Sequence, residues 1–193
     1  MLIAITGTPG TGKSAVSAEL RSRGFEVVDL KEHIVSCGLL GDLDAERDTH
    51  EVDLDLLNAS LGEYREKEGT VFMEGHLSHY MDCGLIIVLR CDPDVLAQRL
   101  GARGYGRDKV LENVQAEVLD VILCESADTD IPVREIDCTG LSVAETADAV
   151  ESAVSGGGSL PGSVDWSSEM EKWFLTDRER GRTSLWPRWP ENW

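Results

Sequence analysis

The chain has 193 residues, enough for one domain with a substantial core and a short appendage. Its 36 acidic and 18 basic side chains give a net charge of −18. This charge argues against broad, sequence-independent binding to nucleic acid or to anionic membranes, and it favours basic protein partners. Such a surface is typical of adaptation to a salty cytoplasm, although an ordinary acidic protein has the same composition.

The cysteines and the hydropathy pattern indicate a cytoplasmic protein without a membrane partner. The five cysteines are an odd number without C-x-x-C spacing, so we expect buried, reduced thiols at Cys37, Cys83, Cys91, Cys124 and Cys138. No apolar stretch reaches the ~18 residues of a membrane-spanning helix, and the N-terminus enters a predicted strand without a charged leader.

The most specific pattern begins directly after this first predicted strand, residues 2–6. It is G-x-x-x-x-G-K-[ST], followed by a helix-like stretch over about 13–23. The matching residues are Gly7, Thr8, Pro9, Gly10, Thr11, Gly12, Lys13 and Ser14. Glycines permit positive φ angles, so successive amides can turn inward around phosphates, and the helix that follows points its positive end at them.

This pattern predicts that the chain binds a nucleoside triphosphate. Lys13 supplies a positive charge to the phosphates, and Ser14 supplies a hydroxyl ligand for Mg²⁺. The alternative is a glycine-rich turn that matches by chance.

Five apolar or β-branched runs alternate with helical patterns along the chain. The runs are residues 2–6, 26–30, 70–73, 85–90 and 134–137. Further helices are expected from about residue 93, over 107–126 and over 143–154. This alternation predicts a three-layer, doubly wound α/β fold in which helices cover both faces of a five-stranded parallel sheet.

Two insertions interrupt the alternation. Residues 31–61 follow the second strand and place an acidic stretch ahead of or within a helix that ends near Lys67. The acidic residues are Asp42, Asp44, Glu46, Asp48, Glu51, Asp53 and Asp55. A short second insertion at residues 103–106 joins two helices.

The chain changes character after residue 155. The first 155 residues carry 30 acidic and 13 basic side chains, whereas the rest carry six and five. Residues 156–163 have the composition of a flexible Gly/Ser linker. The tail, residues 164–193, holds Trp166, Trp173, Trp186, Trp189 and Trp193. It is expected to be either a partner-binding segment anchored by tryptophans or a belt packed on its own domain.

An acid and a histidine follow the third predicted strand, in the segment Glu74-Gly75-His76. We expect Glu74 to hold Mg²⁺ through water, and His76 to orient a nucleophile or sense the γ-phosphate. The alternatives are an ordinary strand-end acid and a capping or packing histidine. A zinc site from His76-x-x-His79 is the weaker interpretation, because no further ligand set has suitable spacing.

Two arginines, Arg99 and Arg103, lie one helical turn apart at the second insertion. Such arginines can swing over phosphates when a segment closes, although a solvated helix face gives the same spacing. Ligands collect at the carboxyl ends of parallel strands. We therefore expect the turn after the fifth strand, Cys138-Thr139-Gly140, to contact an adenine edge through its backbone; a purely structural turn is the alternative.

Together these motifs resemble the adenylate kinase isoenzyme 6 family, also called CINAP. Its members are small adenylate kinase-like ATPases of eukaryotes and archaea that are linked to small ribosomal subunit maturation. The similarity covers residues 1–155. Beyond the phosphate loop it includes Glu74-Gly75-His76, Val88-Leu89-Arg90-Cys91-Asp92, Arg99-Leu100, Arg103-Gly104-Tyr105 and Asn113.

The resemblance implies a nucleoside monophosphate kinase core, with residues 31–61 as the monophosphate-binding insertion and residues 103–108 as a short lid. It implies the reaction ATP + AMP ⇌ 2 ADP, ATP hydrolysis, and a basic small-subunit ribosomal protein as partner in rRNA maturation. By the same resemblance the loop from Gly7 to Ser14 holds the ATP phosphates. Glu74 and His76 form an acid-x-His pair, and Arg99 and Arg103 are lid arginines.

The chain departs from these relatives on the acceptor side. Many adenylate kinases hold the AMP phosphate with an arginine, where this chain has Lys31-Glu32-His33; Lys31 or Arg47 would have to replace it. Glu74 stands where an aspartate is common. Two alternatives to AMP phosphorylation therefore stay open: an ATP-hydrolysing ribosome assembly factor, and a kinase for another small acceptor.

Overall fold

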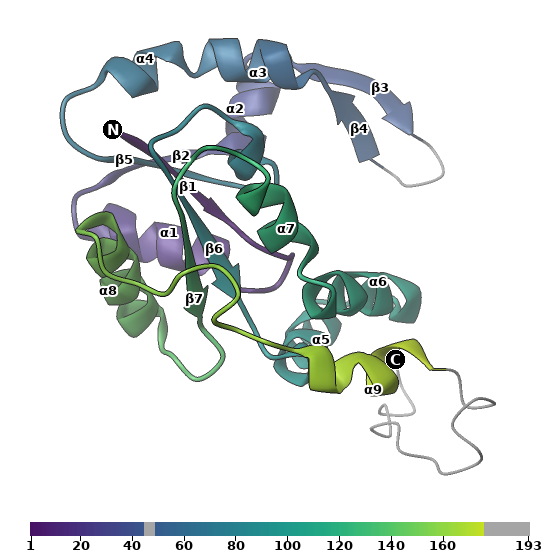
Figure 1. The fold of residues 1–193 in the computed structure, drawn as a ribbon. Helices are drawn as coiled ribbons and strands as arrows, with labels where there is room; N and C mark the ends of the chain where they lie inside the picture. The colour runs from purple at the N-terminus through teal and green to yellow at the C-terminus, as the bar shows by residue number, and fades with distance from the viewer. Residues whose placement is uncertain (45–48, 176–193) are drawn as a thin grey trace.

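The computed structural model describes residues 1–44 and 49–175. At its centre five parallel strands lie in the order β2-β5-β1-β6-β7 (Figure 1). They are β1 (Leu2–Thr6), β2 (Glu26–Asp29), β5 (Val71–Glu74), β6 (Leu85–Arg90) and β7 (Val133–Asp137). Helices cover both faces of the sheet, which confirms the predicted three-layer α/β fold.

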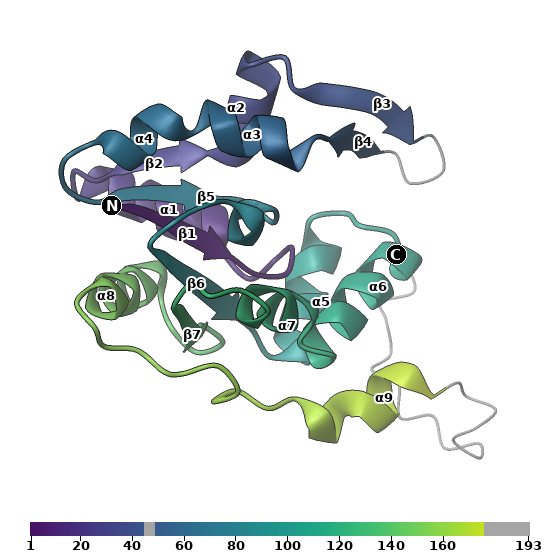
Figure 2. The same ribbon diagram turned by 45° about the horizontal axis from the view of Figure 1, so that its top comes forward.

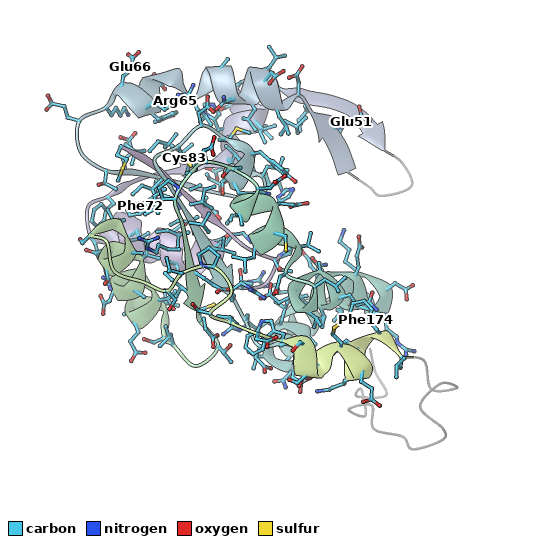
Figure 3. All side chains as sticks on the ribbon, viewed as in Figure 1. Glu51, Arg65, Glu66, Phe72, Cys83 and Phe174 are labelled. Carbon is cyan, nitrogen blue, oxygen red and sulfur yellow. The ribbon has the colours of Figure 1, made fainter. Side chains whose placement is uncertain are left out.

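The helices of the domain body are α1 (Lys13–Ser22), α2 (Leu30–Ser36), α3 (Leu54–Ser60), α4 (Gly62–Glu66), α5 (Pro93–Ala102), α6 (Arg107–Val118), α7 (Val121–Ala127) and α8 (Val143–Val154). A short 3₁₀ turn, η1 (Ser78–Tyr80), follows β5. Because side chains alternate along a strand, Ile3 and Ile5 pack with α1, α5, α6 and α8, whereas Leu2 and Ala4 pack with α2, α3 and α7. Phe72 of β5, labelled in Figure 3, belongs to the first of these two layers.

The predicted boundaries need one correction at the second strand. Residue 30 was expected to end this strand, but Leu30 begins α2. The reason is the cap: a carboxylate oxygen of Asp29 accepts a hydrogen bond of 3.1 Å from the backbone N–H of Glu32. This bond satisfies one of the free amides of the first helical turn, so the helix begins at Leu30 and the strand ends at Asp29.

The helix predicted over 107–126 is two helices. The chain breaks between α6 and α7 at Asp120, which has the left-handed φ of 56°. Its carboxylate accepts a hydrogen bond from the guanidinium of Arg90. The apolar spacing of three and four residues continues across the break, so the periodicity of the sequence could not reveal the break. The contact of Asp120 with the distant Arg90 decides the local conformation.

The insertion after β2 is not wholly helical. It contains α2, an antiparallel hairpin of β3 (Leu40–Asp44) and β4 (Thr49–Val52), and α3, and it leads into α4. Figure 2 shows this group as a layer above one edge of the sheet, with the hairpin extending away from α3. Asp53 caps α3 by accepting hydrogen bonds from the amides of Asp55 and Leu56. The assignment of residues 31–61 as an acceptor-binding unit stays a prediction.

One fully buried cation lies between the sheet and α6. The Arg90 guanidinium donates to the carboxylates of Glu117, Glu135 and Asp120 and to the carbonyl of Glu117 at 3.1 Å. The Arg90, Glu117 and Glu135 side chains are 3% exposed or less. Because buried charges are costly without partners, this cluster fixes how β6, α6 and β7 fit together.

The chain beyond residue 155 contacts the domain body as far as it is described. Ser159 pairs with Glu135 of the edge strand β7. The Glu135 carboxylate also accepts hydrogen bonds from the backbone N–H groups of Ser163 and Val164. Farther on, a 3₁₀ turn, η2 (Ser167–Glu169), leads into α9 (Met170–Phe174). There Trp173 is 2% exposed, and its carbonyl accepts a hydrogen bond from Gln115 of α6.

Residues 156–175 therefore behave as a belt on the body, with Phe174 at the outer end of α9 (Figure 3). Trp186, Trp189 and Trp193 lie outside the described residues. Cys37 and Cys124 are exposed rather than buried, which corrects the expectation for two of the five thiols. Within the described ranges, no helix is long and apolar enough to cross a membrane.

We predict that Arg90→Met destabilises the protein by about 3–5 kcal/mol, because it leaves buried carboxylates without their cation. Urea unfolding in molar KCl measures the loss. Arg23→Met is the matched control: Arg23 also pairs with three carboxylates, of Glu19, Asp148 and Glu151, but at the surface, and its loss is expected to be much smaller. Equal losses in the two variants would contradict this view of the buried cluster.

Candidate nucleotide site

The phosphate loop connects β1 to α1 at the carboxyl end of the sheet. Gly7 and Gly10 have φ angles of 138° and 98°. A Cβ atom at Gly7 would lie 2.4 Å from the carbonyl oxygen of Leu89, and one at Gly10 would lie 2.8 Å from the side chain of Leu96. These two positions require glycine both for backbone conformation and for space, so the loop can pack tightly against β6 and α5.

Lys13 folds back over the loop. Its ammonium donates hydrogen bonds to the carbonyl oxygens of Gly7 at 2.6 Å and Thr8 at 3.1 Å. Burial lowers the pKa of Lys13 to about 8, against the opposing charges of Glu74 and Glu117. A lysine in this position is ready to exchange two neutral carbonyls for anionic phosphate oxygens.

Glu74 ends β5 next to this lysine and is 6% exposed. In the sheet it stands beside Ile5 on one side and Asp29 on the other. Burial, and then the charge of Asp29, raises the pKa of Glu74, while Lys13 and a hydrogen bond from the Ser14 hydroxyl act against this shift. The structure thus brings together the acid, the lysine and the hydroxyl that the sequence singled out.

The two histidines after β5 have different environments. His76 is exposed, and desolvation together with the charge of Lys13 lowers its pKa. His79 is 1% exposed and lies between the Thr6 hydroxyl and the Glu125 carboxylate, at 3.1 Å from each. No cluster of three or more metal-binding side chains occurs among the described residues, so nothing in that part supports a zinc site here.

A cavity of about 260 Å³ lies beside the loop. Of the predicted residues, it brings together Gly10, Thr11, Gly12, Arg99, Arg103 and Cys138. The Arg99 guanidinium donates to the carbonyl of Thr11 at 3.3 Å. The charge of Arg103 helps to lower the pKa of Lys13, which places this arginine near the same ammonium.

The turn after β7 contributes less to this cavity than expected. Thr139 and Gly140 are not among its lining residues. The Thr139 hydroxyl instead donates to the Asp137 carboxylate and accepts the backbone N–H of Asp92. The side of the cavity near this turn is formed by residues that the sequence reading missed, namely Leu141, Val143 and Thr146. Leu141 and Val143 are exposed apolar side chains. The sequence shows only that they are apolar and follow the turn after the fifth predicted strand, and Val143 is predicted only as the start of a helix.

Of the two predicted acceptor residues, Lys31 does not line this cavity and is exposed on the first turn of α2. Arg47 lies outside the described residues. Glu117 of α6, which no sequence motif singles out, accepts a hydrogen bond from the Thr8 hydroxyl of the loop.

Comparison with known proteins identifies the family. A family model described as "AAA domain" matches residues 3–120. Two archaeal proteins described as "Putative adenylate kinase", from Methanocaldococcus jannaschii and Archaeoglobus fulgidus, are each 43% identical to this chain. The alignments cover 90% and 89% of this chain, and 96% and 94% of the two relatives. The chain belongs to this archaeal adenylate kinase family.

The nucleotide kinase fold is found in solved structures as well. A shikimate kinase from Acinetobacter baumannii in complex with shikimate superposes with a TM-score of 0.58 at 15% identity, over 80% of this chain and 93% of the other. A deoxyadenosine kinase from M. mycoides gives 0.52 at 15% identity, over 81% and 100%. At such identities these two neighbours support the fold and do not bear on the acceptor.

We predict that affinity for ATP falls as the pH rises through about 8. Lys13 binds phosphates as a cation, and its pKa of about 8 means that it loses its proton in this range. Titration calorimetry from about pH 7 to 9.5 measures the change, since unperturbed lysines stay charged over most of it. In Lys13→Arg the charge persists, so whatever affinity remains should not decline. A flat profile in the wild-type protein would contradict the assignment.

Proposed function

We propose that this nucleotide kinase transfers the γ-phosphate of ATP to AMP and forms two molecules of ADP. The observation that carries the proposal is the 43% identity, over nearly the whole length, to archaeal proteins described as adenylate kinases. The arrangement of Lys13, Glu74 and the two arginines around the phosphate loop supports it, because phosphoryl transfer depends chiefly on positioning and on charge neutralisation.

On the ATP side, the loop from Gly7 to Ser14 holds the phosphates through backbone amides. Lys13 leaves the carbonyls of Gly7 and Thr8 and pairs with the β- and γ-phosphates. Arg99 and Arg103 line the adjacent cavity and neutralise the charge that develops during transfer. Cys138 lines the cavity, and the turn that it begins with Thr139 and Gly140 is where the adenine base is expected.

The donor set near Lys13 fits a magnesium ion. The Ser14 hydroxyl acts on the Glu74 carboxylate and lowers its pKa, and a hydroxyl with a carboxylate is the hard oxygen pair that Mg²⁺ prefers. When bound, Mg²⁺ neutralises phosphate charge. Ser14 would hold the ion directly and Glu74 through water, while His76, whose pKa is lowered by desolvation and by the charge of Lys13, orients the attacking group.

On the acceptor side, the AMP phosphate requires a basic side chain. Two basic side chains next to the insertion have other partners: Arg65 donates to the side-chain and main-chain oxygens of Asn58, and Lys67 pairs with Glu26. Lys31 or Arg47 would then bind the AMP phosphate. The many acidic residues of the insertion favour a second function. In this function water is the acceptor, and ATP hydrolysis serves assembly of the small ribosomal subunit.

The resemblance to the adenylate kinase isoenzyme 6 family implies this second function as well as AMP phosphorylation. We propose it for a cytoplasmic, salt-adapted protein whose partner is a basic small-subunit ribosomal protein. The net charge of −18 supports a basic partner through electrostatic complementarity. The two functions are compatible, because one site can pass phosphate to AMP or to water.

Measurement of ADP formation in molar KCl separates the two functions. We expect AMP to increase ADP formation from ATP well above the rate with ATP alone, and other monophosphates to do so less. Lys13→Ala should lower the rate at least about a hundredfold, as expected for a cation that stabilises charge in the transition state. Lys109→Ala, an exposed lysine at the start of α6, is the control.

Each outcome has a clear meaning. ADP formation that does not respond to AMP would exclude the kinase and leave ATP hydrolysis. Equal turnover by the wild type and Lys13→Ala would exclude both functions. ADP formation that does not need Lys13 would then have to come from a contaminating protein.

A further inference from the structure

Glu117 connects three parts of the molecule through one buried carboxylate. It belongs to α6, and its side chain is 3% exposed. One carboxylate oxygen accepts from Arg90 at 2.8 Å and from the backbone N–H of Cys91 at 3.1 Å. The other accepts from the hydroxyl of Thr8 in the phosphate loop. Both oxygens are thus occupied, and one of them is committed to the loop.

Thr8 stabilises the turn of the phosphate loop through its backbone carbonyl. Its carbonyl accepts three hydrogen bonds: from the backbone N–H of Thr11 at 3.2 Å, from the Thr11 hydroxyl at 2.9 Å and from the ammonium of Lys13 at 3.1 Å. Thr8 is 1% exposed, so solvent cannot replace the Glu117 carboxylate as its partner. Fixing the Thr8 side chain therefore fixes the carbonyl that holds Lys13.

Charge gives Glu117 a second link to the same lysine. The groups that act on Lys13 are Glu74 from β5, Glu117 from α6, Arg103 from the end of α5, and Cys138 after β7; His76 also faces it. Glu74 and Glu117 raise the pKa of Lys13, whereas burial and Arg103 lower it. Glu117 is thus one of the two carboxylates that act on the Lys13 ammonium, as well as the partner of Thr8.

We propose that Glu117 is a positioning residue of the ATP site, which holds the phosphate loop through Thr8 and thereby fixes the carbonyl that binds Lys13. The proposal rests on the proposed function only in that the loop binds ATP; it does not depend on the acceptor. Since α6 begins directly after the short segment that carries Arg103, the same contact ties the helix after this segment to the loop.

The test compares two carboxylates that share Arg90. Glu117→Gln removes the charge that faces the loop. Asp120→Asn removes a carboxylate that also accepts from Arg90 but makes no hydrogen bond to the phosphate loop in the described part of the chain, and asparagine tolerates the left-handed conformation at this position. A merely structural role predicts similar effects of both variants on ATP binding.

We expect Glu117→Gln to weaken binding of an ATP analogue with an imido bridge between its β- and γ-phosphates by roughly tenfold, the effect of losing one charge-assisted hydrogen bond. Asp120→Asn should change the affinity less than about twofold, as for a site outside the contact. Equal losses in both variants, or full affinity in Glu117→Gln, would overturn the proposal.

Thr8 variants keep the proposal testable if Glu117→Gln does not fold. Thr8→Val removes the hydroxyl that donates to Glu117, so affinity should fall. Thr8→Ser keeps a hydroxyl and should recover most of that loss. If the Thr8→Val and Thr8→Ser variants bind the analogue equally well, the hydroxyl contact has no positioning role. The analogue needs no acceptor, so failure of AMP phosphorylation would leave all these results interpretable.

Discussion

The buried Arg90 guanidinium is the interaction on which the arrangement of this molecule depends. It needs its three carboxylates, because an unpaired charge of this burial is too costly to retain. Those carboxylates come from α6, from the break before α7 and from β7. One of them, Glu117, also contacts the phosphate loop, and another, Glu135, also holds the start of the C-terminal belt. A single cation therefore links the nucleotide site to the outer edge of the sheet.

The phosphate loop is built at a cost that ligand binding can offset. Gly7 and Gly10 leave no room for a side chain, and Lys13 is held partly desolvated against backbone carbonyls. Phosphate oxygens are stronger partners than these carbonyls, and they restore the charge that burial disfavours. The same features that disfavour the free lysine thus prepare the site for a triphosphate.

Much of the fold could be predicted because buried parallel strands appear as short apolar runs, as at residues 85–90. The site residues in local motifs, such as Lys13 and Glu74, could be predicted for a similar reason: the carboxyl ends of adjacent strands meet. The split at Asp120 and the contact of Glu117 with Thr8 could not, because their partners are 30 and 109 residues away in the chain. The hairpin of β3 and β4 lacks the apolar alternation that reveals a half-buried strand.

The destination of the γ-phosphate distinguishes the proposed kinase from an ATPase most directly. ATP labelled with radioactive phosphorus in its γ-phosphate is incubated with the full chain and AMP in molar KCl, and the products are separated by chromatography. AMP phosphorylation places the label in the β-phosphate of ADP, and Lys13→Ala abolishes this product. Label found in inorganic phosphate alone, at the same rate with and without AMP, would contradict the assignment of AMP as the acceptor.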